Sequence, residues 1–287
     1  MEDSDFPALY RSANALSLKS QNNFFRALKL HLMLLIFAAI FSIINIPHWS
    51  ISVFQLIFLL GALFCSVYLF GLRPDRHWYS GRAVAESIKT ITWRYVCCAE
   101  PFQESDVLSK SKFQNKLKAI IEQNKDVAGA LINYLDAPQI SDAMSQLRRL
   151  GLQERKATYA NYRIKDQLTW YAKKATFNRK TANKFFCALI LVNVLAVFCA
   201  IFRIKFSEIS FWPTDVFVAG SACLLSWIQA KRFSELATSY ALTAYEISII
   251  KENSLQPQTD EEFSLFVGDA ENAFSREHTQ WVARKDV

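Results

Sequence analysis

The feature that most constrains this chain is a run of 43 residues, Leu30–Leu72, that contains no Asp, Glu, Lys or Arg. The hydrocarbon core of a bilayer is about 30 Å thick, and an α-helix of about 20 residues crosses it. The run therefore predicts two membrane spans, at about 30–46 and 51–72, joined by a turn at Pro47–Ser50. A soluble domain does not need such a stretch, so an ordinary soluble enzyme is excluded.

A second apolar pair lies in the other half of the chain. Residues 185–202 carry no charge, and residues 212–230 carry only Asp215, close to one end. Both segments are near the lower length limit for a span, which flanking side chains and local thinning of the bilayer can accommodate. We therefore predict an all-α integral membrane protein with four transmembrane helices, arranged as two hairpins.

Lysine and arginine indicate how the hairpins are oriented. They are frequent before and after each predicted hairpin, whereas the turn inside the first hairpin has none and the loop inside the second has only Arg203 and Lys205. Cytoplasmic loops carry an excess of Lys and Arg. Both hairpins are thus predicted to point outward, with both termini and the middle segment in the cytoplasm. The same bias accounts for the net charge of +7 without nucleic-acid binding.

The two halves of the chain resemble each other. A shift of 161 residues places Phe24–Phe25 on Phe185–Phe186 and Ala39–Phe41 on Ala200–Phe202. A basic helix before each hairpin and an amphipathic helix after it support a duplication, with two parallel repeats related by an axis along the membrane normal. We predict the two units as residues 1–147 and 148–287.

The segment after the first hairpin places charged and aromatic residues on one helical face. Trp78, Arg82, Glu86, Lys89 and Trp93 follow each other at steps of four, four, three and four residues. Oppositely charged side chains at this spacing stabilise a helix by about 0.2–0.5 kcal/mol per pair. The face either docks this helix on a neighbouring helix or senses a ligand or partner.

Two more such faces occur in the second half. Arg163, Asp166 and Trp170 align before the third span, and Glu271, His278 and Trp281 align near the C-terminus. Polar helices are expected at 107–135 and 140–155, and together these helices predict a cytoplasmic helical bundle. The charged helices beside the hairpins are expected to join the spans without a flexible linker, so that movement of the bundle moves the spans.

The polar residues outside the spans resemble those of a known family. The resemblance is carried by Trp78, Gly81-Arg82, Glu86, Lys89 and Trp93, by Arg163, Asp166-Gln167 and Trp170, and by the stretch 269–281 with Glu271, Arg276, His278 and Trp281. These positions are similar to the SLATT family of two-transmembrane effector domains, which are associated with SMODS nucleotidyltransferases and SLOG nucleotide-sensing domains in bacterial conflict systems. The first half resembles one subtype and the second half another.

This resemblance implies a membrane effector that opens a pore on a nucleotide-derived signal and harms an infected cell. The chain departs from the family's usual setting because it carries two such units and no recognisable nucleotidyltransferase or SLOG domain. The signal is therefore expected to reach its own helices directly, or to come through a separate nucleotide-synthesising or nucleotide-sensing partner.

No catalytic residue, cofactor or metal site is predicted. The sequence has no G-x-S-x-G, H-E-x-x-H, P-loop or G-x-G-x-x-G motif, and only seven glycines. Four of the six cysteines lie in apolar runs, and Cys97 and Cys98 are adjacent, which fits neither a zinc site nor a disulfide framework.

Small and polar residues align within the predicted spans. The polar members are Ser42 and Asn45 in the first span, Gln55 and Ser66 in the second, Asn193 in the third and Ser226 in the fourth. Such faces either pack helices closely together or line a weakly polar pore. No Asp, Glu, Lys or Arg lies in the middle of a span, which argues against a proton pump or ion-coupled transporter.

The sequence thus favours a membrane effector of the bacterial inner membrane that forms a pore or otherwise perturbs the bilayer. Four narrow apolar helices cannot enclose a conducting path alone, so a symmetric homo-oligomer is expected. One alternative is a membrane-anchored adaptor whose bundle recruits or regulates a soluble enzyme, and a weaker one is a small-molecule transporter. Toxicity or conductance supports the effector, whereas a stable soluble partner and an inert membrane support the adaptor.

Overall fold

The computed structural model describes residues 1–283 apart from 45, 47, 135, 207 and 210, and it describes side chains as far as Ser275. Helices, turns and irregular connections account for all of these residues, without a strand, so the all-α prediction is confirmed. The chain divides into two compact units. We call Met1–Gln21, Pro74–Ala172 and Tyr240–Val287 the polar unit, and Asn22–Arg73 and Lys173–Ser239 the apolar unit.

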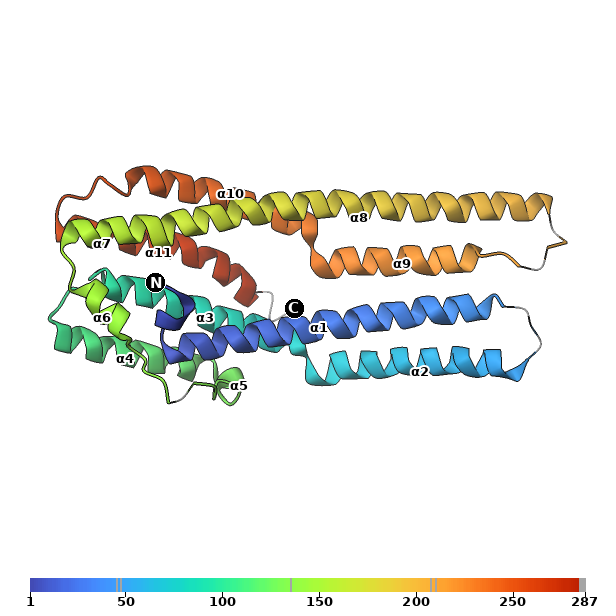
Figure 1. The fold of residues 1–287 in the computed structure, drawn as a ribbon, viewed down its shortest axis with the longest axis horizontal. Coiled ribbons are helices and arrows are strands. Elements are labelled where there is room, and N and C mark those ends of the chain that lie inside the picture. The colour runs from blue at the N-terminus through green and yellow to red at the C-terminus, as the bar shows by residue number, and fades with distance from the viewer. Residues whose placement is uncertain (45, 47, 135, 207, 210, 284–287) are drawn as a thin grey trace. The chain divides into compact units, whose positions relative to one another are not determined.

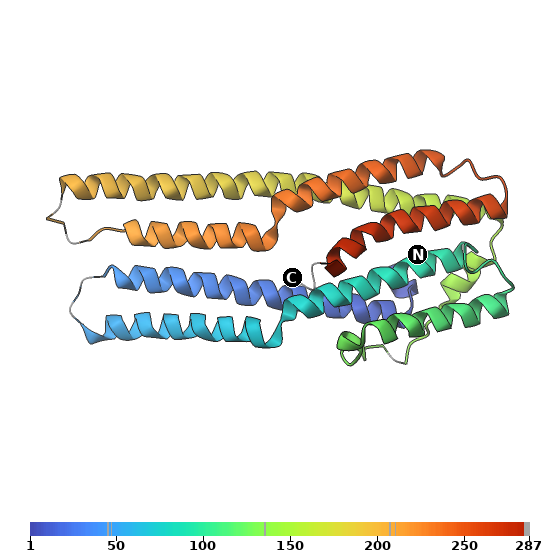
Figure 2. The same cartoon turned by 180° about the vertical axis from the view of Figure 1, so that it is seen from behind.

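The apolar unit consists of two helical hairpins. Its helices are α2 (Trp49–Leu72), α9 (Thr214–Lys231) and the second parts of α1 (Ala8–Ser42) and α8 (Lys165–Lys205). Figures 1 and 2 show α1 beside α2 and α8 beside α9. The His31 ring lies 3.0 Å from the carbonyl oxygen of Ala62 within the first hairpin. The Cys223 thiol, 3.6 Å from the carbonyl oxygen of Leu32, joins α9 to α1.

Three long helical stretches of the described chain are apolar enough to cross a membrane, and they lie within Ala8–Ser42, Trp49–Val96 and Leu152–Lys205. In their most apolar windows only 6%, 11% and 0% of the residues are buried, so these surfaces are available to lipid. The predicted first, second and third spans fall in these stretches, although α1 ends at Ser42, before the expected limit at Ile46. The fourth predicted span corresponds to α9, which is not among the three.

The polar unit contains most of the shorter helices. They are η1 (Asp3–Asp5), α3 (Pro74–Val96), α4 (Asp106–Gln123), α5 (Lys125–Ala128), α6 (Asp142–Arg148), α7 (Leu152–Tyr159), the π-helical turn η2 (Ala160–Ile164), most of α10 (Phe233–Asn253) and α11 (Asp260–Ala283). Helix α3 lies at the centre and packs against α11, α4 and α6. Trp93 of α3 and aromatic residues from four other segments form this core, since Trp93, Phe102, Phe113, Tyr159 and Phe263 are all almost fully buried.

The two polar helices expected at 107–135 and 140–155 are each broken, so these predictions were wrong in length. Helix α4 ends at Gln123 and is followed by the single turn α5. The second segment forms α6 and α7, separated where Gly151 begins a new helix and its amide donates to Glu154 Oε2 at 3.3 Å. The sequence pattern does not show the second break, because α6 and α7 both bury residues at helical spacing, including Met144 in α6 and Tyr159 in α7.

Each apolar hairpin ends in the same way. Arg73 (φ 39°, ψ 58°) follows α2 and Arg232 (φ 52°, ψ 38°) follows α9, and in both cases a new helix begins at the next residue. A left-handed residue ends an α-helix and redirects the chain. The expectation of a direct connection therefore holds for the unbroken α8, but the connection after the first hairpin contains a one-residue break. The shared break fits a duplication of the two halves.

Helices α1 and α3 approach closely inside the polar unit. A Cβ atom on Gly81 would lie 3.1 Å from the Ser17 amide nitrogen and 3.2 Å from the Ala13 carbonyl oxygen. The Ser17 hydroxyl also donates to the Trp78 carbonyl at 3.2 Å. This crossing requires glycine because the atoms that face it belong to the backbone.

Candidate functional site

The most deeply buried charged group of the described chain is an ion pair in the polar unit. Arg163 lies in the π-helical turn at the start of α8, and Glu271 lies in α11. The guanidinium donates from Nε to Oε1 at 2.8 Å and from Nη2 to Oε2 at 2.7 Å, and the side chains are only 1% and 0% exposed. The Tyr159 hydroxyl donates to the same carboxylate at 3.0 Å. This bidentate geometry fixes the end of α8 that is nearest in sequence to α7.

Both partners of Glu271 have shifted pKa values. Burial by itself lowers the pKa of Arg163, but the charge and hydrogen bonds of Glu271 more than reverse this and hold the pKa above its ordinary value. Burial, reinforced by the neighbouring carboxylate of Glu271, raises the pKa of Tyr159 well above its ordinary value. The guanidinium is therefore charged and the tyrosine neutral at physiological pH, so both groups act here as fixed hydrogen-bond donors to Glu271.

The charged face predicted on α3 lies against this cluster. Arg82 and Glu86 form an ion pair at 2.5 Å, in which the glutamate is 4% and the arginine 35% exposed. Burial lowers the pKa of Lys89, and the charge of Glu86 opposes this shift. Arg163 and Asp166 also act on the pKa of Lys89, which places the charged residues of α3 and α8 in one electrostatic neighbourhood.

The two indoles at the ends of this face differ in their surroundings. Trp93 is 1% exposed and contacts the rings of Phe6 and Tyr159 at centroid distances of 6.4 and 5.8 Å. Its indole nitrogen has no hydrogen-bond partner within the described residues. Trp78 is half-buried and stacks on Tyr79 at 4.7 Å. The Trp93 end of the face therefore belongs to the core of the polar unit, whereas the Trp78 end reaches the surface.

The residues of the face predicted before the third span have different environments in the fold. Arg163 is buried, Asp166 is exposed and accepts a hydrogen bond from Gln167 at 3.2 Å, and Trp170 contacts Tyr240 of α10 at 5.4 Å. On α11, Glu271 is buried, whereas the side chains of Arg276, His278 and Trp281 lie outside the described residues. The structure thus brings Arg163 and Glu271 together, two residues that the sequence placed on separate faces.

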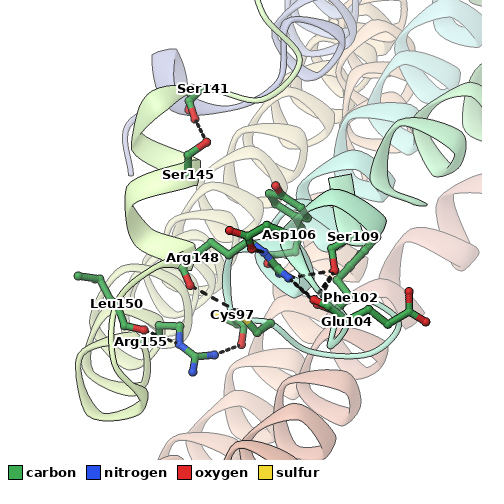
Figure 3. Close-up of polar contacts among 12 residues, drawn as sticks. Cys97, Phe102, Glu104, Asp106, Ser109, Ser141, Ser145, Arg148, Leu150 and Arg155 are labelled. Carbon is green, nitrogen blue, oxygen red and sulfur yellow. Dashed lines mark hydrogen bonds and ion pairs between the residues drawn. The ribbon is translucent and has the colours of Figure 1, made fainter. Parts of the chain in front are cut away.

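Two buried arginines that the sequence did not single out hold the turns around α3 (Figure 3). Arg148 donates to the carbonyls of Tyr95, Phe102 and Glu104 at 2.6, 2.9 and 3.1 Å, and to Asp106 Oδ1 at 2.9 Å. Arg155 donates to the carbonyls of Leu150 and Cys97 at 3.0 and 2.8 Å. It also donates to Asp260 Oδ1 at 2.5 Å. Most of these acceptors are backbone carbonyls, which leave no pattern of side chains in the sequence.

The polar residues predicted for a pore or packing face mostly satisfy themselves locally. Ser66 donates to Ala62, Asn193 to Leu189 and Ser226 to Ala222, each one helical turn earlier, at 3.2, 2.9 and 2.8 Å. Ser42 is exposed and Gln55 is half-buried, while Asn45 lies outside the described residues. Most buried positions in the predicted spans are small residues, namely Ala38, Ala62, Cys65, Ala196 and Cys223, and Ile228 of α9 is buried as well. Small residues at buried positions allow helices to approach closely.

The described residues offer no metal-binding cluster of three or more His, Cys, Asp or Glu side chains. Burial raises the pKa of the Cys97 thiol well above its ordinary value. A nucleophilic cysteine requires the opposite shift. The site is therefore an electrostatic and packing centre that fixes helices.

The fold and this site define a helical membrane protein in which apolar hairpins are joined to a polar helical unit. Residues 7–156 match the model of SMODS and SLOG-associating 2TM effector domain 3, and residues 159–281 match that of SMODS and SLOG-associating 2TM effector domain 1. The chain belongs to the SLATT family and contains two tandem domains of different subtypes. These are effector domains and not enzyme families. Neither a curated protein nor a solved structure matches the chain.

Proposed function

We propose that this protein is a membrane effector that forms an oligomeric pore, or otherwise perturbs the inner membrane, in a bacterial anti-phage or conflict response. One observation carries the proposal. Helices α1 and α8 each run without a break from the polar unit, where Ser17 and Tyr171 are buried, into an uncharged apolar segment. Two of the spans are therefore linked to the polar unit by continuous helix.

The proposal includes α9 as a fourth span. Its 18 residues rise about 27 Å, slightly less than the hydrocarbon thickness. Asp215 at one end and Lys231 at the other lie where long side chains reach the interface. The Lys231 ammonium lies 3.3 Å from the Phe25 ring, which is an arrangement suited to the boundary between lipid and water.

Assembly and orientation complete the proposal. The spans of one chain pack through small residues and leave most of their apolar surface exposed, so a conducting path requires several copies in a symmetric homo-oligomer. The distribution of Lys and Arg supports a cytoplasmic position for the polar unit and both termini. The trigger is a nucleotide-derived signal, received by the polar unit or delivered by a separate partner protein.

The test is inducible expression of the full chain in bacteria with a dye that reports membrane potential, with and without the proteins encoded beside it. We expect depolarisation and growth arrest that require the signal-producing neighbour. An unchanged potential together with a soluble enzyme that co-purifies stably would contradict the proposal and favour a membrane-anchored adaptor. An unchanged potential with uptake or export of a solute would favour a transporter.

A further inference from the structure

Helix α8 carries a stripe of cations immediately before its apolar segment. Lys173, Phe177, Lys180 and Lys184 recur at steps of four, three and four residues and occupy about 60° of the helix circumference. All four are exposed, Phe177 by 59%. Among the described residues, no ion pair joins these three lysines to a carboxylate. Helices at a membrane interface combine lysines with apolar side chains such as phenylalanine.

The same face of α8 continues into the membrane segment. Leu191, Leu195, Phe198 and Phe202 lie in register with the stripe because α8 is unbroken, and they are 59%, 38%, 53% and 51% exposed. The lysines thus lie above the face that meets the lipid tails. A lipid that packs along this face has its headgroup beside Lys180 and Lys184.

A shallow groove adjoins this face. Its volume is about 340 Å³, and its lining comes from α8 alone: Ile190, Asn193, Val194, Val197, Phe198 and Ile201. The one polar lining group, the Asn193 amide, donates to the Leu189 carbonyl of its own helix. The other five lining side chains are apolar, so the groove suits a hydrocarbon chain. The exposed Arg179 lies on the same flank of the helix as the groove.

This end of the apolar unit is strongly basic. Phe185 within α8 contacts Phe233, the first residue of α10, at 5.4 Å, and Lys231 at the end of α9 lies over the ring of Phe25 within α1. Exposed Arg26 and Lys29 add to the positive charge. The nearby carboxylate of Glu235 is paired with Arg232 at 2.6 Å.

We infer that α8 binds an anionic phospholipid, whose phosphate is held by Lys180 and Lys184 and whose acyl chain lies in the groove from Ile190 to Ile201. Lys184 and Ile190 are about 9 Å apart along the helix, close to the thickness of the headgroup region of one leaflet, about 5–8 Å. This site is independent of whether the protein forms a pore. It requires only that α8 spans the membrane.

The test measures which lipids the purified full-length protein retains. The protein is reconstituted in vesicles of phosphatidylcholine mixed with phosphatidylglycerol, extracted and analysed by native mass spectrometry. Wild type is expected to retain phosphatidylglycerol in preference to phosphatidylcholine. Lys180→Gln/Lys184→Gln is expected to lose this preference by roughly twenty-fivefold, since each basic residue near an anionic surface contributes about fivefold. Lys110→Gln/Lys116→Gln on α4 removes the same charge from exposed lysines of the polar unit and is expected to behave as wild type.

A second variant tests the groove. Val194→Trp fills it without changing charge, and we expect weaker retention of the lipid although both lysines are present. Extraction with alkaline carbonate verifies that each variant is inserted. Equal retention of the two lipids, or no difference between the lysine variant and its control, would overturn the inference. Displacement of the lipid by millimolar inorganic phosphate would assign the lysines to free phosphate instead.

Discussion

At the scale of single residues, the Arg163–Glu271 pair is the contact whose loss should be most costly. A buried ion pair contributes little relative to an apolar pair of the same size, but removing one partner leaves a charge buried without compensation. We predict that Arg163→Met lowers the free energy of unfolding by about 3–5 kcal/mol. The measurement is chemical unfolding of the protein in detergent.

Two further variants make this prediction specific. Arg163→Met/Glu271→Leu should be less destabilising than the sum of the single changes, because the two residues act as one unit. Lys118→Met is the control, since its pair with Glu122 is 3.9 Å long and largely exposed, and pairs of this kind contribute at most about 1 kcal/mol. Additive effects in the double variant would show that Arg163 and Glu271 are not coupled.

Gly81 gives a second prediction at this scale. Gly81→Ala places a methyl group 3.1–3.3 Å from backbone atoms of α1, which cannot rotate away. We expect a loss of about 1–3 kcal/mol of stability. Gly268→Ala is the matched control, because no atom lies within 4 Å of the added Cβ in α11 and alanine favours helix by up to about 1 kcal/mol. A stability order opposite to this would mean that α1 and α3 do not cross at Gly81 in solution.

A contact of the site could be predicted from the sequence only where the two interacting side chains lie on the same helix. The helical spacing correctly identified Arg82 and Glu86 as neighbours, because both lie on α3 one turn apart. The same spacing could not pair Arg163 with Glu271, which are 108 residues apart and meet only through tertiary packing. Arg148 and Arg155 were missed because their acceptors are mainly carbonyls of turns, whose positions depend on the fold.

At the scale of helices, the two left-handed arginines define where each hairpin ends. A residue other than glycine in this conformation costs roughly 1–2 kcal/mol. We therefore predict that Arg232→Gly is neutral or stabilising by about that amount, whereas Arg232→Val destabilises, because a β-branched residue tolerates positive φ least. Thermal unfolding in detergent measures both. Equal destabilisation by glycine and valine would show that the Arg232 side chain, with its 2.6 Å contact to Glu235, matters more than its backbone.

The elements themselves were predicted with uneven success. Long apolar runs predicted α2 and the apolar part of α8 well, since membrane length alone sets their extent. The breaks at Arg73, Arg232 and Gly151 were not predicted. Arginine is not a typical helix-ending residue, and the apolar periodicity continues on both sides of Gly151. Local chain direction at these points follows from packing rather than from intrinsic helix propensity.

At the scale of the whole molecule, the distribution of Lys and Arg makes a prediction of topology. In a background without native cysteines, cysteine at positions 49 and 208 should react with a membrane-impermeant reagent from outside, and cysteine at 93 and 281 should not. Labelling is compared between intact and permeabilised cells. Trp93 is buried in the fold, so a cysteine at position 93 could be protected by the fold rather than by the membrane. Protection at position 93 therefore supports a cytoplasmic location only if labelling appears once the protein is unfolded in permeabilised cells. External labelling at 281 would reverse the proposed orientation.

Coupling between the polar and apolar units is the final prediction. Helix α8 passes from one unit to the other at Ala172, and a continuous helix transmits rotation or tilt, whereas a glycine linker does not. We predict that four glycines inserted after Ala172 abolish signal-dependent depolarisation while membrane insertion stays intact. This position leaves the Lys173–Lys184 stripe unchanged. The same insertion after Ile209, in the connection between α8 and α9, should preserve the response, since that end of α8 is remote in sequence from the Arg163–Glu271 contact. Full depolarisation by the Ala172 insertion would mean that the polar unit does not gate the spans through α8, and that assembly in the bilayer alone opens the membrane.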